Sequence, residues 1–157
     1  MFLKYLTVFL ISMVPILELR GAMPIALGMD IPFPAALLIC GLGNIAPVPF
    51  LYLFARKFLK WGAAKPRIGK FCRFCLDKGE AAGQKLAKKA GRGGLFIALV
   101  IFVGIPLPGT GAWTGAVGAS FLDMGFKSTV AAVSLGVVMA GIIMALASTG
   151  VFAVFGL

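Results

Sequence analysis

The sequence has 157 residues, of which 61% are hydrophobic and only 13% are charged. About 25% of the residues of a soluble domain are charged, so this composition excludes a soluble enzyme or binding domain and predicts an integral membrane protein. One bilayer crossing takes about 20 apolar residues. We therefore expect a single all-α membrane domain over residues 1–157, with room for about four to six membrane segments.

The formal net charge of +10 is concentrated in one part of the chain. Residues 56–92 contain twelve of the fifteen Lys and Arg residues, against two acidic residues, Asp77 and Glu80. Because Lys and Arg collect in the cytoplasmic loops of membrane proteins, we predict a basic cytoplasmic loop here and place the protein in the cytoplasmic (inner) membrane. The stretch "DKGEAAGQKLAKKAGRG" is typical of a short amphipathic helix at the membrane surface, where anionic lipid head groups rather than nucleic acid are the expected partners.

Four apolar stretches lie outside this loop, two continuous and two interrupted. Residues 35–55 and 128–157 are continuous and long enough to cross a membrane. The interrupted stretches are residues 2–29, with "ELRG" at 18–21, and residues 94–122, with "PGTG" at 108–111.

The two interrupted stretches resemble each other. "RGAMPIALG" (20–28) and "TGAWTGAVG" (110–118) share two glycines and two alanines at equivalent positions. Asp30 and Asp123 follow them, each just before a long apolar run, where an Asp is a typical helix N-cap. Corresponding broken segments in two halves are typical of transporters whose site lies at the repeat interface. We predict an internal duplication, with repeat 1 over 1–55, the basic loop over 56–92 and repeat 2 over 93–157.

Two topologies fit the interrupted stretches. As full crossings, each would be a helix of about 42 Å, longer than the ~30 Å hydrocarbon core requires. As re-entrant hairpins, the arms 94–105 and 112–122 would each be about 17–18 Å long and would reach the middle of the bilayer. Hairpins leave one true crossing per unit, so the two repeats would be inverted. We favour the hairpins, although Lys4 and Lys127 do not decide the matter, because either topology places only one of them on the cytoplasmic side.

The first interruption offers two charged side chains, Glu18 and Arg20, at or near membrane depth. A charge there costs at least about 2.5–3.5 kcal/mol on insertion, so each needs a partner or a wet cavity. One interpretation is a structural salt bridge between them at the membrane surface. The other is a substrate path, in which burial favours the protonated form of Glu18, so that it carries a proton, while Arg20 stays charged and binds a phosphate or carboxylate.

The second interruption offers irregular backbone. Its prolines lack an amide donor and leave preceding carbonyl groups without a partner, and its glycines permit tight turns. Such backbone occurs at membrane depth only where it is buried in protein or lines a wet cavity. We predict a hairpin turn followed by a helix N-terminus suited to an anionic group; the alternative is a purely structural turn. The candidate residues are Pro106, Pro108, Gly109, Thr110 with its hydroxyl, Gly111, and Trp113 as an amphipathic wall or an interface anchor.

Three further polar residues are secondary candidates. Asn44 lies inside an apolar run beside Pro47 and Pro49, where it bonds across helices or lines the cavity. Asp30 and Asp123 are candidates by their matching places in the two halves, although N-capping alone explains them.

We expect no enzyme, cofactor or metal site. The chain has no histidine, no serine nucleophile motif, no glycine-rich phosphate loop and no acidic cluster. Cys72 and Cys75 form a single "CRFC" pair, and a structural zinc site needs four ligands. We expect this pair to be reduced cysteines on the cytoplasmic side.

The stretches "ELRGAMP" (18–24) and "FVGIPLPGTGAWTGA" (102–116) resemble the small multidrug export family, a prokaryotic membrane group, and the resemblance covers nearly the whole chain. More distantly, the chain is similar to the DedA superfamily, whose members carry two re-entrant hairpins with functionally important acidic and arginine residues. The resemblance implies inverted hairpins here, with Glu18 as the acidic residue. The second interruption has no arginine, so Arg20 or Arg92 would have to take that part.

The resemblance also implies proton-coupled transport, of lipid carriers or phospholipids as readily as of drugs. We expect a transporter that moves a small amphipathic compound or a lipid phosphate, coupled to protons through Glu18. The alternatives are a lipid scramblase or flippase and a non-transporting membrane scaffold. The oligomeric state stays open, a homo-oligomer included.

Overall fold

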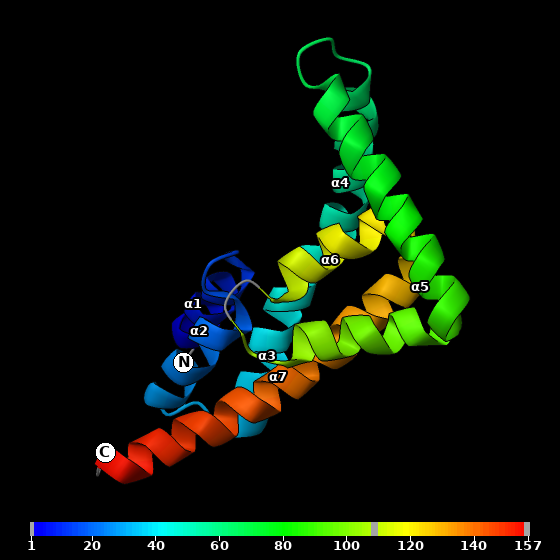
Figure 1. Ribbon diagram of the computed structural model, residues 1–157. Helices are drawn as coiled ribbons and strands as arrows, with labels where there is room; N and C mark the ends of the chain where they lie inside the picture. The colour runs from blue at the N-terminus through cyan, green and yellow to red at the C-terminus, as the bar shows by residue number, and fades with distance from the viewer. Residues whose placement is uncertain (1, 108–109, 156–157) are drawn as a thin grey trace.

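The computed structural model of the protein describes residues 2–107 and 110–155. Over these two ranges the fold is all-helical, as predicted, and contains no strand (Figure 1). The helices in chain order are α1 (Phe2–Met13), α2 (Glu18–Gly28), α3 (Phe33–Ile45), α4 (Val48–Ala63), α5 (Gly69–Gly104), α6 (Ala112–Phe121) and α7 (Phe126–Phe155).

Two of the helical stretches are long and apolar enough to cross a membrane. They are Phe33–Ala63, which comprises α3 and α4, and Phe126–Gly150 within α7, with mean hydropathies of 1.8 and 2.5. These stretches match the two continuous apolar runs of the sequence. Pro47 precedes α4 and lacks the amide that would continue the helical bonding pattern, which explains why α3 and α4 are separate helices.

The interrupted stretches consist of short helices that pack in pairs. α1 contacts α2, and α6 contacts α5. Gly115 of α6 lies against Val103 and Leu99 of α5, where a Cβ on the glycine would meet a Val103 methyl group at 2.6 Å. α6 therefore turns back along the last part of α5.

The basic segment was predicted to be a loop with a short helix in it; the helix is present as part of α5, but the rest of the segment is mostly helical as well and forms an arm. α4 ends at Ala63 and α5 begins at Gly69, so the five residues 64–68 connect two helices that contact each other. Gly62 permits the close approach, because a Cβ there would lie 2.6 Å from Cys72 Sγ. In Figure 1 the last part of α4 and the first part of α5 extend away from the other helices, and α5 bends sharply before it returns. The bend is at Gly91, whose φ of 69° and ψ of 176° are not helical.

α7 lies at the centre of the fold and contacts α2, α3, α5 and α6. The buried faces are rich in alanine and glycine, which let helices approach closely. A Cβ on Gly136 of α7, for example, would lie 2.9 Å from the Val100 carbonyl oxygen of α5. This packing brings the two interruptions of the sequence together.

Candidate functional site

Glu18 is the first residue of α2 and follows the short turn after α1. Its φ of 48° is in the left-handed region, which costs a non-glycine residue about 1–3 kcal/mol and persists only where the surroundings impose it. Its backbone N–H donates to the Val14 carbonyl at 2.8 Å. With this backbone the side chain enters the protein, and only 7% of the residue is exposed.

The carboxylate of Glu18 lies at the N-terminus of α6. The backbone N–H of Trp113 donates to Glu18 Oε1 at 3.3 Å. The first amides of a helix have no partner inside that helix, and the positive end of the helix dipole favours a carboxylate. The chain therefore supplies its own anion to this N-terminus, from the other interruption.

Gly111 provides the space for this contact. Its backbone is extended, with φ of 179°, so its conformation alone does not require glycine. A Cβ at this position would overlap the carboxylate of Glu18. Glycine is required here because the carboxylate occupies the volume that a side chain would take.

Arg20 also reaches the second interruption. Its Nη1 donates to the Leu107 carbonyl, and its Nη2 donates to Thr110 Oγ1 at 2.8 Å. Thr110 Oγ1 is itself 2.9 Å from the Ile105 and Leu107 carbonyl oxygens, either of which can accept its proton. Arg20 thus satisfies the Leu107 carbonyl beyond the end of α5, near the negative end of that helix dipole.

The salt bridge between Glu18 and Arg20 that one interpretation predicted does not occur. Both side chains instead bind the second interruption: Glu18 the start of α6, and Arg20 the segment that follows α5. Each charge meets the helix end whose dipole is complementary to it. The two interruptions are consequently held together by polar contacts across 87 to 95 residues of sequence.

A cavity of about 530 Å³ lies between the two interruptions. Its volume is within the roughly 300–1,000 Å³ range of small-molecule sites. Glu18 and Arg20 are its charged members, and Thr110 contributes a hydroxyl. The lining residues are Pro15, Ile16, Leu17, Glu18, Arg20, Pro106, Thr110, Thr114 and Met144.

Asn44 of α3 faces the same region from the other side. It lines a smaller void together with Glu18, Arg20 and Gly111, and that void has no room for a water molecule. Only 3% of Asn44 is exposed, and its Oδ1 has no hydrogen-bond partner. A buried amide oxygen without a partner costs about 1–3 kcal/mol. The polar side chain of Asn44 therefore lowers the stability of the fold.

Residues 18–143 match the family model described as "Putative small multi-drug export protein". The chain belongs to this family. The match begins at Glu18 and includes both interruptions, as the resemblance of the two motifs predicted. No curated protein and no solved structure matches the chain.

The prediction that Asp30 and Asp123 are helix N-caps is wrong. Each is the second residue after the end of a helix, beyond the C-cap residue, with φ of 61° at Asp30 and 54° at Asp123. The amide of Ile31 donates to the Ala26 carbonyl at 3.1 Å, and the amide of Met124 to Ala119 at the same distance. These are the bonds of the Schellman motif, in which a left-handed residue ends the helix. The sequence expectation failed because Asp tolerates this conformation nearly as Asn does.

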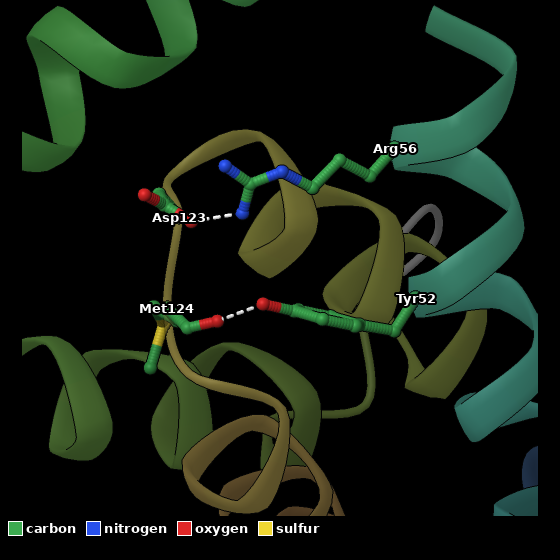
Figure 2. Close-up of polar contacts among 4 residues, drawn as sticks. All are labelled: Tyr52, Arg56, Asp123 and Met124. Atoms are coloured by element: carbon green, nitrogen blue, oxygen red, sulfur yellow. Dashed lines mark hydrogen bonds and ion pairs between the residues drawn. The ribbon is translucent and has the colours of Figure 1, made fainter. Parts of the chain in front are cut away.

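The corner at Asp123 is clamped by α4. Figure 2 shows Arg56 paired with the Asp123 carboxylate and the Tyr52 hydroxyl donating to the Met124 carbonyl. At the other corner, Lys4 Nζ donates to the Met29 carbonyl at 3.1 Å. Asp30 and Asp123 therefore lie outside the cavity and have structural roles at the two corners.

The remaining candidates from the second interruption lie in different places. Pro106, Thr110 and Gly111 lie at the site, whereas Pro108 and Gly109 fall outside the described residues. Trp113 contributes its backbone amide; its indole N–H is buried without an acceptor, and the ring is not among the residues that line the cavity.

Sequence reasoning missed Thr114 and Met144, which also line the cavity. Thr114 lies one helical turn after Thr110, which was a usable signal, but Met144 lies in a uniformly apolar helix that gave none. Within residues 2–107 and 110–155, no three His, Cys, Asp or Glu side chains gather closely enough to hold a metal ion.

Proposed function

We propose that this protein is a membrane transporter that moves a small amphipathic compound or a lipid phosphate, coupled to protons through Glu18. The observation that carries the proposal is the buried Glu18 carboxylate, bound to the opposite half of the chain beside a cavity of about 530 Å³. The family description, which names small multidrug export, agrees with transport. No catalytic step forms part of this function.

In the proposed topology, α1 with α2 and the end of α5 with α6 are two re-entrant hairpins that belong to inverted repeats. The lengths support it: helices of 12, 11 and 10 residues extend about 15–18 Å, roughly half of a ~30 Å hydrocarbon core. The hairpin tips would then meet near the bilayer midplane. The matching corners at Asp30 and Asp123 support the duplication, and a distant DedA relationship would account for this arrangement.

The contact between Glu18 and α6 suggests how a proton couples to movement. The Glu18 carboxylate accepts a charge-assisted hydrogen bond from the Trp113 amide, which is long at 3.3 Å. Protonation of Glu18 removes the charge and its attraction to the helix dipole. The two hairpins would then separate more easily, which would expose the cavity to the other side.

Flux into proteoliposomes with an imposed pH gradient tests the proposal. Glu18→Gln keeps the shape and an oxygen that accepts the Trp113 N–H but cannot carry a proton, so we expect it to abolish the dependence of flux on the gradient. Asp77→Asn, at an exposed carboxylate on the arm, is the matched control and should behave as wild type. Full gradient-driven flux in Glu18→Gln would disprove the coupling.

The same assay separates the two alternatives. A lipid scramblase would equilibrate a labelled lipid in both directions without a gradient, and Glu18→Gln would leave that exchange unchanged. A scaffold would move neither a lipid nor an amphipathic drug under any condition.

We also propose that the arm, residues 56–92 of α4 and α5, lies on the anionic cytoplasmic surface of the membrane. Its exposed aromatic residues alternate with basic ones: Lys65 Nζ lies 5.0 Å from the Trp61 ring, and Lys78 Nζ lies 5.8 Å from the Phe74 ring. Such a surface has apolar groups for the interface and charges for anionic head groups. The arm would thereby fix the orientation of the protein in the inner membrane.

A further inference from the structure

A second cavity, of about 260 Å³, lies between α5 and α6 and is open to the surface at the exposed residues Ala98, Phe102 and Thr114. Thr114 is the polar side chain in it. Its α5 wall comes from one helical face with spacings of three and four residues, and its α6 wall is mostly small. The lining residues are Leu95, Ala98, Leu99, Phe102, Thr114, Gly115, Gly118, Ala119, Leu122 and Met124.

Glycine keeps this second cavity open on the α6 side. A Cβ on Gly118 would meet nothing within 4 Å, so the backbone borders free volume there. At Gly115, one turn earlier, a Cβ would meet Val103 at 2.6 Å, so that glycine serves close packing instead. Gly118 thus marks the place where a side chain could fill the cavity without displacing anything.

Thr114 lines both cavities. On one side of it lies the polar cavity with Glu18, Arg20 and Thr110, and on the other lies the apolar slot between α5 and α6. A site that joins a few polar groups to a largely apolar pocket is typical of small-molecule binding. The two volumes, about 530 and 260 Å³, therefore adjoin at one residue and differ in chemistry.

We propose that the two cavities form one binding site for an anionic amphiphile with a single apolar tail. The head group lies beside Arg20 and Thr110, where the guanidinium has donors beyond the two already used, and the tail lies in the slot bordered by Gly118. Among the described residues, a slot of about 260 Å³ adjoins the polar cavity through Thr114, and a volume of this size accommodates one short tail. The inference rests on the proposed function and assigns its substrate class.

Binding of n-alkyl phosphates to the reconstituted protein tests the site. In a Trp61→Phe background, Trp113 is the remaining one of two tryptophans. Its backbone amide binds Glu18, which lines the polar cavity, so we use its fluorescence to report binding. Octyl phosphate has four more methylenes than butyl phosphate. Each buried methylene contributes about 0.8 kcal/mol, which is roughly a fourfold gain in affinity.

The decisive variant is Gly118→Leu, which places a side chain in the slot. We expect octyl phosphate to bind it at least about tenfold more weakly, as the loss of two buried methylenes predicts, while butyl phosphate binds as to the wild type. Gly28→Leu is the matched control, because Gly28 is the equivalent residue of the first interrupted stretch and a Cβ there also meets nothing within 4 Å. Unchanged octyl phosphate binding in Gly118→Leu would overturn the proposal.

Competition then separates two sources of this chemistry. Displacement of octyl phosphate by lysophosphatidate but not by 1-anilinonaphthalene-8-sulfonate assigns a lipid, and the reverse result assigns a non-lipid amphiphile. Displacement by neither excludes the site. Because these are binding measurements, they stand or fall separately from flux: a protein that binds in this pattern but transports nothing refutes the proposed function alone.

Discussion

At Gly111 the absence of a side chain allows the two halves of the chain to contact each other. The Glu18 carboxylate occupies the space in which a Cβ would project. We expect Gly111→Ala to displace that carboxylate, to lower stability by about 1–3 kcal/mol through overpacking, and to lower transport. Thermal unfolding in detergent gives the first quantity and vesicle flux the second.

The control for this substitution is Gly125→Ala. Gly125 is exposed, and a Cβ there would meet nothing within 4 Å. It should unfold at the wild-type temperature, and equal unfolding temperatures for the two variants would show that the carboxylate is not confined by Gly111.

Asn44 gives a second prediction at this scale. Its buried Oδ1 has no partner, and replacing such a group with an apolar one of similar size is neutral or stabilising. We expect Asn44→Leu to be at least as stable as the wild type but impaired in transport, because the amide is then lost from the region around Glu18. A clear fall in the unfolding temperature would mean that Asn44 is hydrogen-bonded in the membrane.

Gly91 controls the geometry of an element. Its φ of 69° and ψ of 176° lie in a region that essentially only glycine occupies, and they set the bend between the arm and the last part of α5. We expect Gly91→Ala to cost about 1–3 kcal/mol, or to straighten the helix, as measured by thermal unfolding and by the distance between spin labels on the arm and on α7.

Gly93, two residues further on, is its matched control. It has no positive φ and open space around its Cα, so Gly93→Ala should stabilise the helix by about 0.5–1 kcal/mol. The two substitutions are chemically identical, and opposite signs are the expected result.

Periodicity and composition predict elements well here and connections poorly. The two continuous apolar runs and the two interruptions are visible in the sequence because proline, glycine and charge stand out against apolar residues. The length of the helical arm was underestimated because its glycines and dense positive charge are typical of a loop, whereas a contact that supports the helices, that of Gly62 with Cys72, is non-local. The Asp corners were misassigned because an N-cap and a Schellman residue lie within a few positions of each other between consecutive helices.

The candidate site shows the same division. Glu18, Arg20 and Thr110 were identified because polar groups are costly among apolar ones. The hydrogen-bond partners of Glu18 and Arg20 were not identified, because these residues are two positions apart and a bond between them is the simplest local solution. Packing around α7 instead offers each a helix end, which no local pattern encodes.

The orientation of the whole molecule depends on the arm. In a Trp113→Phe background, Trp61 becomes the reporter, and 57% of it is exposed. We expect its emission to shift to shorter wavelength, and its quenching by aqueous iodide to fall, in vesicles with anionic lipid compared with zwitterionic ones. Replacing Lys57, Lys60 and Lys65 with Gln should remove the difference, and added salt should weaken it.

An arm that packs against a second copy would behave otherwise. Trp61 would then be shielded according to the protein-to-lipid ratio and not according to lipid charge. That result would reject the membrane-surface role of the arm.

The bond between Glu18 and Trp113 also has a consequence for synthesis. Its two ends are 95 residues apart, and ribosomes add about 5–20 residues per second, so the partner of Glu18 emerges roughly 5–20 seconds after it. During that interval the first half holds a charged group that has no helix end to meet. We expect the nascent chain to keep this segment at the membrane surface and to complete its insertion only when α6 arrives, which makes the order of translation part of the folding mechanism.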